Sequence, residues 1–63
     1  MYIMNNTKAI KDIIIKALKN DMTHKKVISS EYSDSDFAVI DLAFSIDEKK
    51  KLSVYRITVD KKE

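Results

Sequence analysis

The side chains that could take part in catalysis or metal binding are few in this sequence. The chain has one histidine, His24, and no cysteine, so thiolate nucleophiles, disulfides and thiolate-bound metals are excluded. A serine nucleophile needs a histidine base and an orienting acid in one pocket, and 63 residues leave little wall for a pocket. A ribonuclease built from His24, lysines and Arg56 would need fewer groups, but His24 is better explained as a favourable charge at a helix end. We therefore expect no enzyme, no metal and no cofactor.

The alternating serines and aspartates of residues 33–36 suggest a calcium loop at first sight. An EF-hand loop, however, needs a glycine at its turn and a distal bidentate glutamate, and this chain has no glycine. An acidic surface over residues 31–48 that imitates DNA phosphates is a second reading, but three lysines follow this stretch directly at residues 49–51. A polar turn is the favoured interpretation of this segment.

Lysines are concentrated in the first part of the chain. Residues 1–26 hold six lysines against two aspartates, a net charge of +4, whereas residues 27–63 have a net charge of −2. A basic helical face can follow nucleic-acid phosphates, but no arginine precedes Arg56 to read guanine. The possible nucleic-acid-binding residues are Lys8, Lys11, Lys16, Lys19, Lys25 and Lys26.

Residues 7–20 predict an amphipathic helix. Its apolar side chains recur at intervals of three and four residues, the spacing of one helical face. Asn5, Asn6 or Thr7 can cap the start, and Asn20 can end the helix in the left-handed conformation. We expect Ile15 to lie on the outer, lysine-bearing side. The residues expected to be buried are Ile10, Ile13, Ile14, Ala17 and Leu18.

The second half of the chain changes to the two-residue period of β-strands. Every second residue from Ala38 to Ile46 is apolar, and residues 52–59 are rich in β-branched and aromatic side chains. A helix over residues 35–50 would also place some apolar residues on one side, but strict alternation favours a strand. A third strand is predicted over residues 25–32.

A turn at residues 47–50 fixes how the last two strands pair. Leu42 then faces Tyr55, and Ile40 faces Ile57, on the face that forms the core. The same register sets Asp41 opposite Arg56 on the other face, where the charges are complementary. In the weaker strand, Ile28 and Tyr32 are expected to join the core face.

These elements predict a single α+β domain over residues 1–63, with one N-terminal amphipathic helix packed on a three-stranded antiparallel β-sheet. No apolar run is long enough to span a bilayer, and the N-terminus does not look like a secretory signal, so we expect a cytoplasmic location. A chain this short is marginally stable, and association is the stabilising device left to it. The expected function is therefore protein binding, as a homodimer or as a small regulator or inhibitor from a phage or mobile element. The predicted protein interface comprises Val39, Asp41, Ala43, Leu52, Val54 and Arg56 on the uncovered sheet face.

Overall fold

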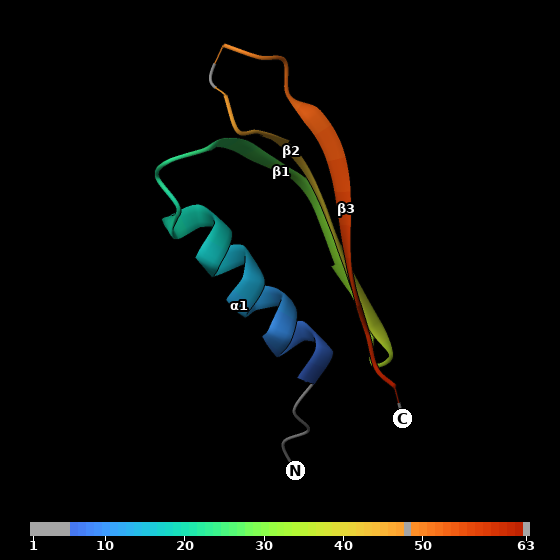
Figure 1. The fold of residues 1–63 in the computed structure, drawn as a ribbon. Coiled ribbons are helices and arrows are strands. Elements are labelled where there is room, and N and C mark those ends of the chain that lie inside the picture. The colour runs from blue at the N-terminus through green and yellow to red at the C-terminus, as the bar shows by residue number, and fades with distance from the viewer. Residues whose placement is uncertain (1–5, 48, 63) are drawn as a thin grey trace.

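The computed structural model describes residues 6–47 and 49–62, so Asn5 as a possible cap lies outside the described residues. Helix α1 (Asn6–Asn20) is followed by strands β1 (Lys25–Ser33), β2 (Phe37–Ser45) and β3 (Ser53–Asp60). The strands form one antiparallel sheet in the order β1-β2-β3, with α1 across one face (Figure 1). The predicted α+β fold is confirmed.

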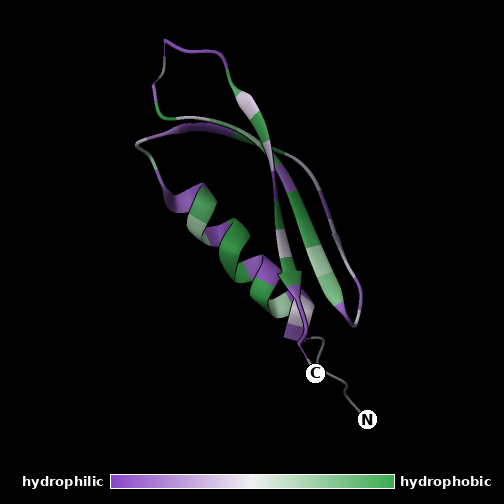
Figure 2. Ribbon diagram, turned by 45° about the vertical axis from the view of Figure 1, so that its right-hand side comes forward, coloured by the Kyte–Doolittle hydropathy of each residue, from purple (hydrophilic) through white to green (hydrophobic). Residues whose placement is uncertain are grey.

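The pairing of β2 with β3 follows the predicted register. Ile40 pairs with Ile57, Leu42 with Tyr55, and Asp41 with Arg56. Hydrophobic and hydrophilic residues alternate along these strands (Figure 2), and Ala38, Ile40 and Leu42 are buried beneath the helix. Strand β2 ends one residue earlier than expected, because Ile46 leaves the sheet and is largely exposed. Its predicted place on the core face is therefore wrong.

Strand β1 contains a β-bulge that the pattern of its sequence does not predict. Ile28 pairs with Leu42, but Ser30 pairs with the adjacent Asp41, so Ser29 is the extra residue. A bulge of this kind shifts the following side chains to the opposite faces. Tyr32 consequently shares the outer face with Val39, its pairing partner, and its predicted core position is wrong.

The helix is rotated about its axis relative to the prediction. Ile10, Ile13 and Ala17 are exposed rather than buried, whereas Ile15 and Lys11 are buried. Two polar contacts accompany this rotation. Thr7 Oγ1 donates to the carbonyl oxygen of Ser35 at 3.2 Å, and Lys11 Nζ donates to Glu31 at 2.7 Å. These two contacts help to fix which side of the helix faces the sheet.

A short turn joins β1 to β2 and holds the start of the helix. The Asp34 carboxylate accepts hydrogen bonds from the backbone N–H groups of Asp36 and Phe37, at 2.8 and 3.0 Å. These backbone hydrogen bonds lower the pKa of Asp34 below its usual value. The predicted polar turn is thus present, and its Ser35 carbonyl receives the bond from Thr7.

Candidate interaction surfaces

The sheet face turned away from α1, called here the outer face, carries three rows to which all three strands contribute. The first row is apolar and contains Val27, Ala43 and Val54, and the third contains Tyr32, Val39 and Thr58. The polar second row lies between them and contains Ser30, Asp41 and Arg56. The outer face therefore has a polar centre flanked by apolar side chains.

The polar row is held together by hydrogen bonds to one carboxylate. Arg56 donates to Asp41 through Nε at 2.8 Å and through Nη2 at 3.2 Å, and Ser30 Oγ donates at 3.0 Å. The Arg56 hydrogen bonds, followed by that of Ser30, lower the pKa of Asp41, and Asp41 in turn raises the pKa of Arg56. A bidentate arginine–carboxylate pair has a defined geometry, so the Asp41–Arg56 pair presents its polar atoms in a fixed arrangement.

Five of the six predicted interface residues lie together on the outer face, and Val54 is 76% exposed. Leu52 precedes β3 and is half-buried in the connection from β2. Sequence reasoning did not include Val27, which the strand alternation places on this face. It also missed Tyr32, whose ring contacts that of Phe37 at 5.7 Å between centroids; only the bulge brings Tyr32 here.

The predicted basic surface is smaller than the sequence indicates. Lys11 is buried against Glu31, and the side chain of Lys26 is only 10% exposed. Lys26 Nζ donates to the carbonyl oxygens of Asp21 and His24, at 2.7 and 2.8 Å. Two of the six lysines thus hold the fold together, and their placement on an outward basic face is wrong. The exposed members of the set are Lys8, Lys16, Lys19 and Lys25.

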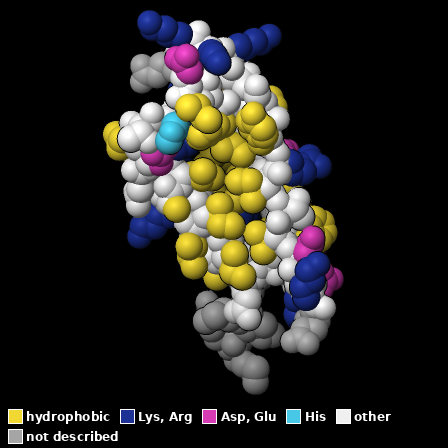
Figure 3. Space-filling model, viewed as in Figure 1, with side chains coloured by type: hydrophobic (Ala, Val, Ile, Leu, Met, Phe, Trp, Pro, Cys, Tyr) yellow, Lys and Arg dark blue, Asp and Glu magenta, His cyan; other side chains and the backbone are white. Residues whose placement is uncertain are grey.

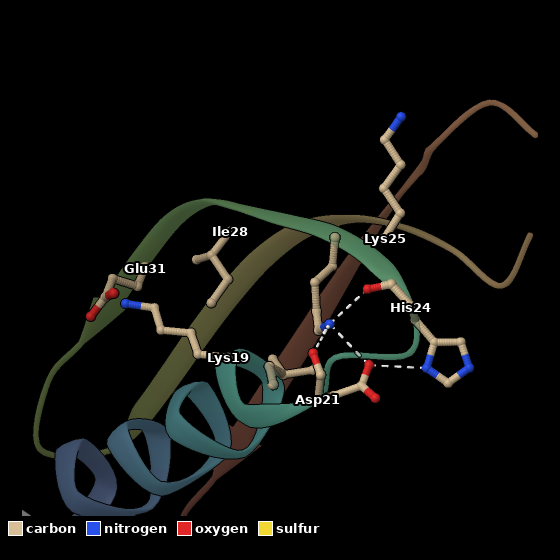
Figure 4. Close-up of a pocket in the computed structure, with 8 residues that line it drawn as sticks. Lys19, Asp21, His24, Lys25, Ile28 and Glu31 are labelled. Carbon is tan, nitrogen blue, oxygen red and sulfur yellow. Dashed lines mark hydrogen bonds and ion pairs between the residues drawn. The ribbon is translucent and has the colours of Figure 1, made fainter. Parts of the chain in front are cut away.

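An open pocket of about 580 Å³ lies between the end of α1 and β1 (Figure 4). Its polar centre is Asp21, whose carboxylate contacts His24 Nδ1 at 3.0 Å and Lys26 Nζ at 2.9 Å. Hydrogen bonds from Thr23, Lys26 and His24 hold the pKa of Asp21 well below its usual value. His24 also packs against Phe44, with ring centroids 5.4 Å apart. These contacts hold the end of the helix against the sheet. Lys25 points away from the pocket (Figure 4).

A second hollow, of about 660 Å³, lies on the helix side of the sheet beyond the end of α1. Leu18, Phe44, Tyr55 and Ile57 form part of its wall, and their side chains are mostly apolar. Hydrophobic side chains gather on the surface between α1 and β3, as the space-filling view shows (Figure 3). This apolar groove is the second uncovered hydrophobic surface of the molecule.

Within residues 6–47 and 49–62, no three acidic or histidine side chains are grouped closely enough to hold a metal ion. In the same part of the chain, α1 is too short and too polar to cross a membrane. No family model, curated protein or solved structure matches the chain.

Proposed function

We propose that this protein is a non-enzymatic interaction module that binds a protein partner on the outer face of its sheet. The observation that carries the proposal is the arrangement of apolar side chains on both sides of the Asp41–Arg56 pair. Apolar side chains next to satisfied polar groups are typical of protein interfaces. Arginine and tyrosine, both present here, are also the residue types enriched among those that dominate binding energy.

The extent of exposed surface supports an associating protein. The accessible surface is 5231 Å² for a chain of 7.3 kDa, compared with about 4,200 Å² for a compact monomer of that mass. The radius of gyration is 13.5 Å, against roughly 11 Å for a compact domain of this length. The protein is therefore more extended and more exposed than a compact monomer of its mass.

The partner in this proposal is a second copy or another protein, and the role is that of an accessory regulator or inhibitor in the cytoplasm. The small size and the isoleucine- and lysine-rich composition suit proteins of phages or mobile elements. Asp41 and Arg56 would set the alignment of the partner, because a fixed charge pair favours specificity and orientation.

The test is Val54→Asp, which puts a charge into an exposed apolar row without touching the buried side chains. The matched control is Met22→Asp, since Met22 is an exposed apolar residue outside the sheet. Light scattering across a chromatographic peak measures self-association, and affinity capture from cells of the source organism measures other partners. We expect Val54→Asp to lose the partner and Met22→Asp to keep it. Retention of every partner by a folded Val54→Asp protein would contradict the proposal.

The alternative is a nucleic-acid-binding protein that uses the exposed lysines of α1. Lys16 and Lys19 are exposed on the helix, and phosphate contacts by such lysines make affinity fall steeply with salt. The alternative predicts that Lys16→Glu with Lys19→Glu abolishes binding to duplex DNA or RNA, whereas Val54→Asp leaves it unchanged. Absorbance at 260 and 280 nm across the peak detects bound nucleic acid. Binding that is undetectable at low salt would dispose of this alternative.

A further inference from the structure

The two edges of the sheet differ in how well they are protected. Strand β1 carries the bulge at Ser29 and begins with Lys25 and Lys26, and bulges and lysines are devices that discourage edge-to-edge pairing. Strand β3 pairs with β2 without a register shift over its eight residues. Its sequence contains no proline or glycine. The β3 edge is thus a regular, unpaired strand edge of the kind that accepts another strand.

We propose that a second copy of this chain pairs with the β3 edge, antiparallel and around a two-fold axis, to give a six-stranded sheet. This inference does not depend on the outer face being a binding site. The two charged residues of strand β3 are Arg56 and Asp60, and the strand consists largely of β-branched and aromatic residues. Such residues favour strand pairing, and a two-fold arrangement of identical patches is the commonest form of homodimer.

The charged residues of β3 favour one register for its pairing with β3 of the second copy. With Thr58 opposite its own copy, Arg56 of each protomer faces Asp60 of the other, and Ile57 faces Val59 on the helix side. With Arg56 opposite its own copy, like charges would meet, which is unfavourable. Arg56 and Asp60 share the outer face. Arg56 has five N–H donors, so it can bind the partner's carboxylate while still bonded to Asp41.

The helix side supplies apolar surface beside the same edge. Lys11 and Lys19 turn toward β1, where Lys11 bonds Glu31 and Lys19 lines the junction pocket. The opposite flank of α1 carries Ile10 and Ile13, and Ile13 is 67% exposed. A two-fold axis perpendicular to the sheet at Thr58 keeps both helices on the same side of the sheet and would bring this flank of each protomer toward that of the other. Pairing would then bury apolar side chains above the new strand pair.

A charge exchange tests the inference directly. Asp60→Arg alone would set Arg56 against an arginine, and Arg56→Asp alone would set Asp60 against an aspartate. Each single variant should weaken the dimer by roughly tenfold or more, as measured by sedimentation or light scattering over a concentration series. An equimolar mixture should restore a heterodimer, because both cross-strand pairs become arginine with aspartate. Asp36→Arg is the matched control, with the same charge change in the β1–β2 turn, and should remain dimeric.

Circular dichroism must show that each variant is folded, since Arg56→Asp also removes the partner of Asp41. Amide hydrogen exchange of the unmodified protein gives a second readout: exchange in residues 55–59 should slow as protein concentration rises. A protein that stays monomeric, or a dimer unaffected by Asp60→Arg, would overturn the inference. A dimer that dissociates with Val54→Asp but not with Asp60→Arg would place the second copy on the outer face, which overturns edge pairing and supports the proposed function.

Discussion

Lys11 of α1 donates a hydrogen bond to Glu31 of β1 over 2.7 Å, from a side chain that is only 6% exposed. The contact joins the middle of the helix to the sheet, and it exists because the bulge at Ser29 turns Glu31 toward the helix. A lysine is seldom buried without a partner. Given the sequence of β1, the bulge therefore helps to determine both the rotation of α1 and the loss of a lysine from the basic surface.

The two members of this pair should respond differently to replacement. Glu31→Ala leaves the Lys11 ammonium buried without its main partner, and we expect a loss of about 1–3 kcal/mol in the free energy of unfolding. Lys11→Met removes the charge and keeps the aliphatic packing, so stability should change by less than about 1 kcal/mol or increase. Urea unfolding measures both values. A larger loss for Lys11→Met than for Glu31→Ala would contradict this account.

Deletion of Ser29 should disturb the junction less than loss of the Glu31 carboxylate. Without the extra residue, Ile28 still pairs with Leu42 and Ser30 with Asp41, so regular alternation keeps Glu31 on the helix side and Tyr32 on the outer face. We expect the deletion to destabilise the protein less than Glu31→Ala, because the Lys11 contact and the rows of the outer face are kept. Ser29→Ala keeps the residue count and serves as the control. Thermal unfolding followed by circular dichroism compares the three proteins.

Because the core is small, the stability of the protein should depend strongly on Ile40, which is fully buried in the central strand. Ile40→Ala should cost about 2–5 kcal/mol, and a chain of this size has a total stability on the order of 3–5 kcal/mol. We therefore expect Ile40→Ala to be largely unfolded at 25 °C, and Ile40→Val to remain folded with a loss of about 0.5–1.5 kcal/mol. Ile13→Ala, on the exposed flank of α1, should change stability little. Equal losses at both positions would show that α1 covers the sheet differently.

Acid should destabilise the fold through its hydrogen-bonded aspartates. The pKa values of Asp21, Asp34 and Asp41 are lowered in the folded protein from their usual 3.8. Because the folded pKa lies below the unfolded one, these groups stabilise the fold fully above the usual value, and the stabilisation is lost as pH falls. We expect the urea midpoint to decline below about pH 4. Asp41→Asn should flatten part of this decline, and an unchanged slope would exclude Asp41 as a contributor.

Local patterns in the sequence determined the secondary structure and one strand pairing. The helix, the alternation of β2, and the Asp41–Arg56 register all follow from the spacing of apolar and charged residues, because each is encoded over short distances. The five outer-face residues predicted on β2 and β3 follow from that same register.

The tertiary structure decided which side of the helix is covered and which face each residue of β1 occupies. Ile15 and Lys11 are buried while Ile10 and Ile13 are exposed, and the contact of Lys11 with Glu31 favours this orientation of α1. The polar contacts of Thr7 with Ser35 and of Lys11 with Glu31 join residues 28 and 20 positions apart. No short-range pattern records such contacts or the bulge at Ser29, since a bulge adds a single residue to an otherwise ordinary strand sequence.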